Sequence, residues 1–572
     1  MELKIDHLGL INEAILKFGD ISIILGPPNT GKSYTLRALY HSLIIFDKDI
    51  VKQAMYDLII DEFNDFVKKL DIKISETFTT LFKLLSKHLV TKHSRRHIID
   101  LNEIESLEKN ILENIEKDIK LLNKENNTSL FILERPQKEE NAYNTNFDIQ
   151  VNINEQKEID VNNLIIRFKE HLENSKYEFL PINDEKTKIR LNKYELPDFK
   201  ILIMDLLNQF VNEKLYFETR SSRFISSKFV SRRIKEIKQG KIEICSSITD
   251  NKLTITGSAK YLVNIPLFLT RTTVYKDDPY FYESYFDLSR TIRRYVRKII
   301  YEHFSESFEL YISESPIKEV IFIPFGRTPL IYLLEYDFLA EIMDNLILNS
   351  YLIKLKKGIQ LLSKKDRPED IIKLFASVIQ GDIKYDKLTK KLRYQKYNSP
   401  DLPIEFSSAL ASEIAGILLP VLTLPPNSFI IIEEPEAQLH YSAQILMALV
   451  LVALSKKYGH KIIFSTHSDI FTITFAYLEK LNYNKNDIIK LIKDLLSVQG
   501  ITVNSEQVDI VANFLSSEKE EISVKYYYYE PSLEEGVRIM QKSSEMIMEE
   551  VPGITNVTEI LASWALNVID NH

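Results

Sequence analysis

Residues 26–33 read Gly-Pro-Pro-Asn-Thr-Gly-Lys-Ser, a full match to the phosphate-loop pattern G-x-x-x-x-G-K-[ST]. The apolar run 21–25 precedes this segment and predicts a buried strand, and the apolar spacing in 33–45 predicts a helix directly after it. Such a loop surrounds a phosphate with its backbone N–H groups, and the N-terminus of the following helix adds positive potential. The chain is therefore expected to form an α/β fold with a mostly parallel sheet.

The loop and the first helical residues are the expected nucleotide contacts. Within them, Lys32 is expected to reach the β and γ oxygens, and Ser33 to bind Mg²⁺. A chance match in a long chain is the alternative, and the flanking strand and helix argue against it. The candidate contacts are Gly26, Pro27, Pro28, Asn29, Thr30, Gly31, Lys32, Ser33 and Tyr34.

Two adjacent carboxylates, Glu433 and Glu434, end the apolar run 429–432. Ionised groups at the end of a buried strand require a cation, a hydrogen-bond donor or a reaction. We expect Glu433 to hold Mg²⁺, directly or through water, and Glu434 to act as the general base on the attacking water. The alternative is a solvated Glu-rich turn, but the preceding turn 425–428 bounds a run that is most simply buried.

Polar groups at two further places complete the expected site. His467 follows the apolar strand 461–466 and is expected to bond the γ-phosphate and the attacking water. A lone histidine at a strand end is usually structural, and the two motifs above favour the functional role. Ser407 and Ser408 open a helix, where hydroxyls and free N–H groups suit a phosphate, although alone they would be an ordinary helix cap.

The order of these motifs resembles the ABC-type ATPase heads of the overcoming-lysogenization-defect (OLD), RecF and SMC superfamily. The run 433–440 is most similar to OLD-like, AAA-type ATPases, and 320–327 is similar to the strand end with Pro-x-x-Arg that they carry. The resemblance covers 1–45 and 318–475. It implies a P-loop NTPase fold that hydrolyses ATP with Mg²⁺.

The resemblance also implies that two heads associate head to tail around two ATP molecules. Ser407 and Ser408 of one subunit would contact the γ-phosphate bound at Lys32 of the other, and 437–440 would couple the two sites. One departure concerns Ala409, because the family usually has glycine there. OLD nucleases carry a C-terminal TOPRIM domain with an Asp-x-Asp motif, which is missing after His467, so no nuclease is expected in this chain.

Four segments are predicted. The ATPase head is split into an N-terminal lobe, 1–46, and a C-terminal lobe, 318–483. Between them lies a large inserted α+β and helical arm, 47–317, with an apolar helical stripe in 104–122 and a strand-like run at 147–153. A C-terminal appendage, 484–572, contains the tyrosine run 526–529, which predicts a strand with one buried face.

The composition of the chain bears on its cellular location. The 572 residues carry a net charge of -8 and a single cysteine, Cys245, so no intrachain disulfide can form. With no secretory signal in view, a reducing, cytoplasmic location is expected. The two long uncharged stretches, 414–432 and 437–455, contain prolines or polar residues and are expected to be buried elements rather than membrane spans.

Two basic clusters in the arm contain aromatic residues, a combination that suits nucleic-acid phosphates. The alternative is a solvated helix face. A third group, His88, His93 and His97, is surrounded by lysines and arginines that would repel a cation, so a structural role is favoured. The candidate nucleic-acid contacts are Arg232, Arg233, Arg290, Arg293, Arg294 and Arg297.

The leading hypothesis is an ABC-type ATPase that forms a homodimer or higher oligomer around ATP. It would couple this cycle to nucleic-acid binding or to a separate effector or nuclease, in antiviral defence or DNA repair by resemblance. One alternative is a non-catalytic, ATP-bound scaffold that sequesters a toxin or effector. A transport-associated ATPase is the other.

Overall fold

The structure is a computed structural model of the chain. It describes the longer ranges 1–88, 101–125, 129–134, 146–174, 188–192, 197–211, 215–219, 236–249, 251–266, 282–333, 346–364, 367–396, 399–480, 522–532 and 536–549, and the short pieces 90–91, 268–269, 486, 489–490, 493–494, 511–512 and 515.

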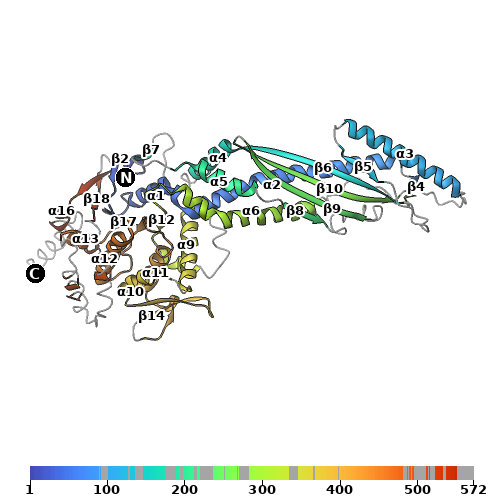
Figure 1. The fold of residues 1–572 in the computed structure, drawn as a ribbon. Coiled ribbons are helices and arrows are strands. Elements are labelled where there is room, and N and C mark those ends of the chain that lie inside the picture. The colour runs from blue at the N-terminus through green and yellow to red at the C-terminus, as the bar shows by residue number, and fades with distance from the viewer. Residues whose placement is uncertain are drawn as a thin grey trace, which may run out of the picture. The chain divides into compact units, whose positions relative to one another are not determined.

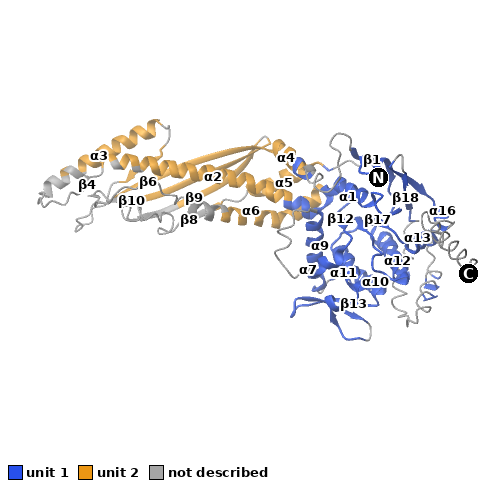
Figure 2. Cartoon of the chain, turned by 180° about the vertical axis from the view of Figure 1, so that it is seen from behind, with its two compact units in different colours: residues 1–53, 170–197, 312–572 blue, residues 54–169, 198–311 orange. Residues whose placement is uncertain are grey.

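The chain divides into two compact units, coloured separately in Figure 2. Unit 1 comprises 1–53, 170–197 and 312–572, and unit 2 comprises 54–169 and 198–311. The predicted arm, 47–317, is therefore not one uninterrupted insertion, because the chain returns to unit 1 between residues 170 and 197. That return supplies the edge strand β7 (Lys188–Asn192) to the sheet of unit 1.

Unit 1 is built on a nine-stranded mixed sheet (Figure 1). Its first five strands are parallel to one another, and the remaining pairs are antiparallel except for β19 with β2. The order is β12 (Val320–Ile323), β16 (Phe429–Glu433), β17 (Lys461–Thr466), β3 (Ile21–Leu25), β18 (Val524–Ser532), β19 (Gly536–Lys542), β2 (Ile11–Lys17), β1 (Glu2–Leu8) and β7. This arrangement is the α/β fold with a mixed, mostly parallel sheet that the sequence predicts.

The parallel strands are rich in apolar residues because helices cover both of their faces. Every residue of β3, β12 and β16 is buried. The register pairs Glu433 with Ser465 and Ser465 with Ile24, so β16, β17 and β3 end together at one edge of the sheet. The predicted loop, acidic pair and histidine all follow these three strand ends.

Residues 524–532 belong to the middle of this sheet and not to a separate appendage. Strand β18 pairs in parallel with β3 and antiparallel with β19. Tyr526 to Tyr529 are all buried, so the prediction of one buried face and one free face is wrong for this strand. On one face Tyr526 and Tyr528 join the main core, and on the other the hydroxyls of Tyr527 and Tyr529 donate to the Lys17 carbonyl and to Thr35 Oγ1.

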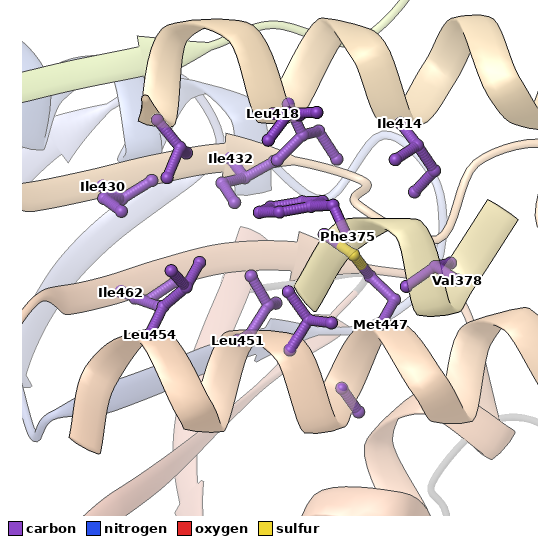
Figure 3. Close-up of a cluster of buried hydrophobic side chains, with 14 of the residues drawn as sticks. Phe375, Val378, Ile414, Leu418, Ile430, Ile432, Met447, Leu451, Leu454 and Ile462 are labelled. Atoms are coloured by element: carbon purple, nitrogen blue, oxygen red, sulfur yellow. The ribbon is translucent and has the colours of Figure 1, made fainter. Parts of the chain in front are cut away.

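The main core of unit 1 packs three helices against one face of β16 and β17. Figure 3 shows Phe375 between Ile432 on the sheet and Met447 on a helix. Each such side chain contributes about 1.5–3 kcal/mol by leaving water. The helices are α10 (Glu369–Ile379), α11 (Ala409–Val421) and α12 (Tyr441–Tyr458).

Other elements of unit 1 surround this layer. They are α1 (Lys32–Leu43), η1 (Ile44–Phe46), α7 (Arg327–Leu333), α9 (Leu346–Leu362), η2 (Ile404–Phe406), α13 (Asp469–Lys480), α16 (Ser544–Glu549) and a small sheet of β13 (Gly381–Asp386), β14 (Lys391–Lys396) and β15 (Leu402–Pro403).

Unit 2 contains a five-stranded antiparallel sheet and long helices. A Cβ added to Gly257 of β10 (Lys252–Pro266) would lie 2.8 Å from the Phe66 ring of α2 (Lys48–His88), so glycine permits the close approach of strand and helix. The strands are, in order, β5 (Phe131–Glu134), β6 (Asn146–Asp160), β10 (Lys252–Pro266), β9 (Glu236–Thr249) and β8 (Leu215–Thr219). The remaining elements are α2 (Lys48–His88), α3 (Leu101–Glu125), α4 (Val161–Asn174), α5 (Phe199–Val211), α6 (Tyr282–Tyr311) and the short pair β4 (Val90–Thr91) and β11 (Phe268–Leu269).

Candidate nucleotide-binding site

The loop between β3 and α1 has the backbone of a phosphate-binding turn. Gly26, Asn29 and Gly31 all have positive φ, at 141°, 60° and 89°. A Cβ on Gly26 would lie 2.6 Å from the carbonyl oxygen of Tyr529 on β18, so only glycine fits there. Strand β18 thus constrains the shape of the loop.

Lys32 is folded back against its own loop. Its Nζ donates to the carbonyl oxygens of Gly26 at 2.8 Å and Pro27 at 2.5 Å, and the residue is only 6% exposed. Burial lowers the pKa of Lys32 to about 8, although the nearby carboxylates of Glu434 and Glu436 oppose the shift. Ser33 and Tyr34, the next residues of α1, are both exposed.

Glu433 carries a buried oxygen that accepts no hydrogen bond. The residue is 4% exposed, and its Oε2 accepts from the backbone N–H of Phe325 at 3.1 Å. Among the described residues, Oε1 has no hydrogen-bond donor, and the guanidinium Nε of Arg37 is 3.8 Å away. A buried carboxylate oxygen without a donor fits a Mg²⁺ ligand or a ligand of its water shell.

Glu434 has an uncommon backbone conformation. Its φ is 44°, in the left-handed region that a glutamate rarely adopts. Its N–H donates to the carbonyl oxygen of Ser465 at 3.1 Å. Burial and the neighbouring Glu433 raise the pKa of its carboxyl group, and the positive charges of Lys32 and Arg327 oppose this.

His467 lies beside Glu434, with His467 Nε2 3.6 Å from Glu434 Oε1. Burial lowers the pKa of the imidazole, and the charge of Lys32 lowers it further, so the neutral form is favoured near pH 7. This form has both a donor and an acceptor nitrogen, as contact with water and phosphate requires.

Glu436 is a site residue that the sequence analysis missed, and it fixes the backbone beside His467. Its Oε1 accepts from Thr466 Oγ1 at 2.6 Å and from the N–H of His467 at 2.9 Å. A second connection joins Ser468 Oγ to Gln444 Oε1 at 2.5 Å, and Gln444 Nε2 donates to the Leu439 carbonyl. The segment 437–440 is thereby tied to the loop after β17.

Ser407 and Ser408 lie at the start of α11. Ser408 is the N-cap and accepts from the N–H of Ala411, whereas Ser407 Oγ donates to the Ile404 carbonyl at 2.7 Å. Ala409 is exposed and does not have positive φ, so this backbone does not itself require glycine. No hydrogen bond or ion pair in the described residues joins either serine to 26–33 of the same chain.

The sequence analysis includes Arg327, the residue at the start of α7, only within the Pro-x-x-Arg strand end and assigns it no role in the site. It is 0% exposed, and it donates to the carbonyl oxygens of both Glu433 and Glu434. The Pro-x-x-Arg text at 324–327 is the signal that could have identified it, because an arginine directly after a buried strand must find partners.

The candidate nucleic-acid contacts belong to unit 2. Arg290, Arg293, Arg294 and Arg297 are all exposed on α6, and the guanidinium of Arg297 lies over the Tyr56 ring, 5.5 Å from its centroid. Arg232 and Arg233 fall outside the described residues, as do His93 and His97. His88 pairs with Asp118 at 2.9 Å.

Two kinds of feature are absent from the described residues. No helix in these ranges has both the length and the apolar character required to cross a membrane. No group of three or more His, Cys, Asp or Glu within the same ranges is arranged to hold a metal ion.

The fold and this edge of the sheet define an ATPase of the P-loop class. The chain belongs to the AAA ATPase domain family, whose family model matches residues 1–472. It therefore binds ATP. No curated protein matches the chain.

Solved structures similar to the chain include SMC head domains at low identity. That from Thermotoga maritima is 8% identical, with 83% of this chain and 90% of that chain covered and a TM-score of 0.24. A head domain with coiled coil and joint from Pyrococcus yayanosii is 11% identical, with 96% and 98% covered and a TM-score of 0.27. A head bound to the C-terminal winged-helix domain of ScpA is 10% identical, with 96% and 99% covered and a TM-score of 0.25.

Proposed function

We propose that this ATPase hydrolyses Mg²⁺–ATP in a site completed by a second copy of the chain. The observation that carries the proposal is the arrangement at one sheet edge: a general-base candidate, Glu434, lies beside His467, and the charge of Lys32 acts on both. The parallel strands β16, β17 and β3 bring these three residues together from distant parts of the sequence.

Each residue has a distinct proposed role. The N–H groups of residues 29–34 and the ammonium of Lys32 bind the phosphates, which requires Lys32 to exchange the carbonyls of Gly26 and Pro27 for phosphate oxygens. Ser33 and the free oxygen of Glu433 hold Mg²⁺, which neutralises charge on the phosphates when bound. Glu434 accepts the proton of the attacking water, and His467 orients that water and the γ-phosphate.

Hydrolysis is tested by comparing wild type with Glu434→Gln. The amide cannot accept the proton, so phosphate release should fall by about 10²–10⁴-fold while ATP affinity is kept. Glu309→Gln, on the exposed face of α6, is the matched control and should behave as wild type. If wild type hydrolyses ATP no faster than Glu434→Gln, the chain is instead a scaffold that binds and holds ATP.

Dimerisation is tested separately. Ser407 and Ser408 make no hydrogen bond to their own loop 26–33 among the described residues, and a helix start suits the phosphate held by a second copy. Glu434→Gln should therefore accumulate ATP-dependent dimers in analytical ultracentrifugation, and Lys32→Ala or Ser408→Arg should abolish them. Dimers that form equally in all variants would contradict the proposal.

A second candidate function is nucleic-acid binding by α6. Four arginines and Lys298 are exposed between residues 290 and 298, and no ion pair with a described residue involves the arginines. The double reversal Arg293→Glu with Arg297→Glu should weaken binding to a DNA duplex. The salt slope should become shallower by about one unit for each phosphate that the variant no longer neutralises.

The control for α6 reverses two exposed lysines of α3, Lys109 and Lys117, which makes the same change in charge. Equal weakening of DNA binding by both pairs of substitutions would show that net charge alone is responsible and would remove α6 as a specific binding surface.

The biological role that we propose is that the ATPase regulates a separate effector or nuclease in antiviral defence or DNA repair. A neighbouring toxin or nuclease gene would support it, and a permease gene would favour transport.

A further inference from the structure

Arg327 joins two parts of the site that are far apart in the sequence. Its Nη1 lies 2.9 Å from the carbonyl oxygen of Glu433, and its Nη2 lies 3.0 Å from that of Glu434. Its Nε lies 2.9 Å from Glu413 Oε2, on α11. One buried guanidinium therefore contacts both the acidic segment after β16 and the helix that begins after Ser408.

Arg327 packs closely against α11. Glu413 is held from a second side by Thr328, whose Oγ1 donates to Oε1 at 2.5 Å. A Cβ added to Gly416, one turn further along α11, would lie 2.9 Å from Arg327 Cγ, so glycine leaves room for the arginine stem. Among the described residues neither Arg327 Nε nor Glu413 Oε2 has a hydrogen-bond partner, so the attraction between the two charges is what offsets their cost of desolvation.

The hydrogen bonds of Arg327 to the acidic segment restrain the backbone of Glu434. Glu434 has positive φ, and this conformation persists only when surrounding groups hold it. Its N–H is held by Ser465, and its carbonyl by Arg327. Since Arg327 also holds the preceding carbonyl, it fixes two successive peptide groups and hence the direction of the Glu434 side chain toward His467.

Helix α11 connects the ion pair between Arg327 and Glu413 to Ser408 at its own N-terminus. Ser408 caps α11, and Glu413 follows five residues later, about 7.5 Å along the helix axis. A displacement of the helix start by a ligand at Ser408 therefore also moves Glu413, and Arg327 transmits the movement to the backbone of Glu434.

We propose that Arg327 is a positioning residue that couples the serines at the start of α11 to the backbone of the general base Glu434. This inference rests on the proposed function, in which those serines touch the ATP of the second copy. Occupancy of one site would then adjust the base of the other, so that the two sites hydrolyse ATP cooperatively.

The test is Arg327→Lys. A lysine keeps the charge, but its single ammonium cannot maintain both the hydrogen bonds to the two carbonyl oxygens and the ion pair with Glu413. ATP affinity and ATP-dependent dimers, the latter measured with Glu434→Gln added, should stay within about threefold of wild type. The kcat should fall by about 10²-fold, as expected when a reacting group is misplaced by about 1 Å. The Hill coefficient for ATP, at most about 2 for two sites, should fall to about 1.

Glu413→Gln is the second variant, and it keeps the side-chain volume while removing the ion pair. It should reduce the Hill coefficient in the same direction, and it decides the question if Arg327→Lys fails to fold. Arg393→Lys is the matched control, because Arg393 forms an ion pair with Asp401 on the small sheet and has no contact with the acidic segment among the described residues.

Two results would overturn the proposal. One is a folded Arg327→Lys protein with wild-type kcat and Hill coefficient. The other is a parallel loss of ATP affinity, dimers and kcat, which would indicate general structural support rather than coupling. Failure of the proposed function would be seen in the wild-type protein itself, which would form no ATP-dependent dimers or would hydrolyse ATP no faster than Glu434→Gln.

Discussion

His467 Nε2 and Glu434 Oε1 lie 3.6 Å apart although they follow different strands. The pair forms because β16 and β17 are parallel neighbours and end in register. The surroundings shift the pKa of each group toward the form that the proposed chemistry needs: the imidazole is neutral, and Glu434 becomes a stronger base when its pKa rises.

The first prediction is a bell-shaped pH dependence of kcat/KM, which reports groups of the free enzyme. On the acid side, activity should be lost as pH falls through the raised pKa of Glu434, because the base becomes protonated. On the alkaline side, activity should be lost as pH rises through about 8, because Lys32 loses its charge. A kcat/KM that stays constant across pH 8 would contradict this role of Lys32.

The second prediction concerns Gly26→Ala. The new Cβ would clash with the Tyr529 carbonyl in a backbone at φ 141°, so the loop must distort. ATP binding should be lost, and the free energy of unfolding should fall by about 1–3 kcal/mol. Isothermal titration and denaturant unfolding would measure the two effects.

Gly326→Ala is the control for that substitution. Gly326 also has positive φ, at 70°, but no atom lies within 4 Å of an added Cβ. The variant should therefore show only the backbone cost of about 1–2 kcal/mol. If both variants bind ATP equally well, close approach of β18 is not what shapes the loop.

The third prediction concerns a buried charge cluster at the beginning of α2. Lys354 of α9 is 1% exposed, and its Nζ lies 3.3 Å from Asp49, 3.6 Å from Asp47 and in contact with Glu319. These carboxylates raise the pKa of Lys354 and outweigh its burial. Lys354→Met would leave three buried carboxylates without their shared cation and should destabilise unit 1 by about 3–5 kcal/mol.

The measurement for Lys354→Met is the midpoint of urea unfolding, with exposed Lys364→Met as the control. The loss should be smaller at low pH, where protonation neutralises the carboxylates. An equal midpoint for the two variants would mean that the cluster does not stabilise the fold.

The fourth prediction is an acid-dependent loss of stability through His460. Burial lowers its pKa from 6.5 to about 4, and its Nδ1 accepts from the N–H of Ser428 at 3.3 Å. Between pH 6.5 and 4 the unfolded chain binds the proton and the folded chain does not, so stability falls as pH is lowered across this window. The full effect is on the order of 3 kcal/mol.

His460→Gln should remove most of that pH dependence in unfolding titrations, because glutamine does not titrate. A variant with the same slope as wild type between pH 6.5 and 4 would assign the effect to other groups.

The sequence predicts the parts of the site that depend on local patterns. A glycine-rich loop after one apolar run and a carboxylate pair after another place Lys32 and Glu433 at the ends of buried strands, and parallel pairing brings such ends together. The long gap between the two motifs predicts an insertion, but it does not predict the return of residues 170–197 to unit 1.

The remaining features depend on long-range contacts that leave no local pattern. The position of β18 beside β3, the clamp formed by Arg327 and Glu413, and the anchoring of His467 by Glu436 each join residues through the folded sheet. The apolar periodicity of a strand predicts that it is buried, but it does not specify its neighbour.

The position of β18 beside β3 has a consequence for biosynthesis. Asp20, at the entrance to β3, bonds Ser523, which is 503 positions later. A ribosome adding about 5–20 residues per second needs roughly 25–100 s to cover that interval. The phosphate loop is thus synthesised well before the strand that supports it, so a nascent chain that stops before residue 524 should be unable to hold ATP.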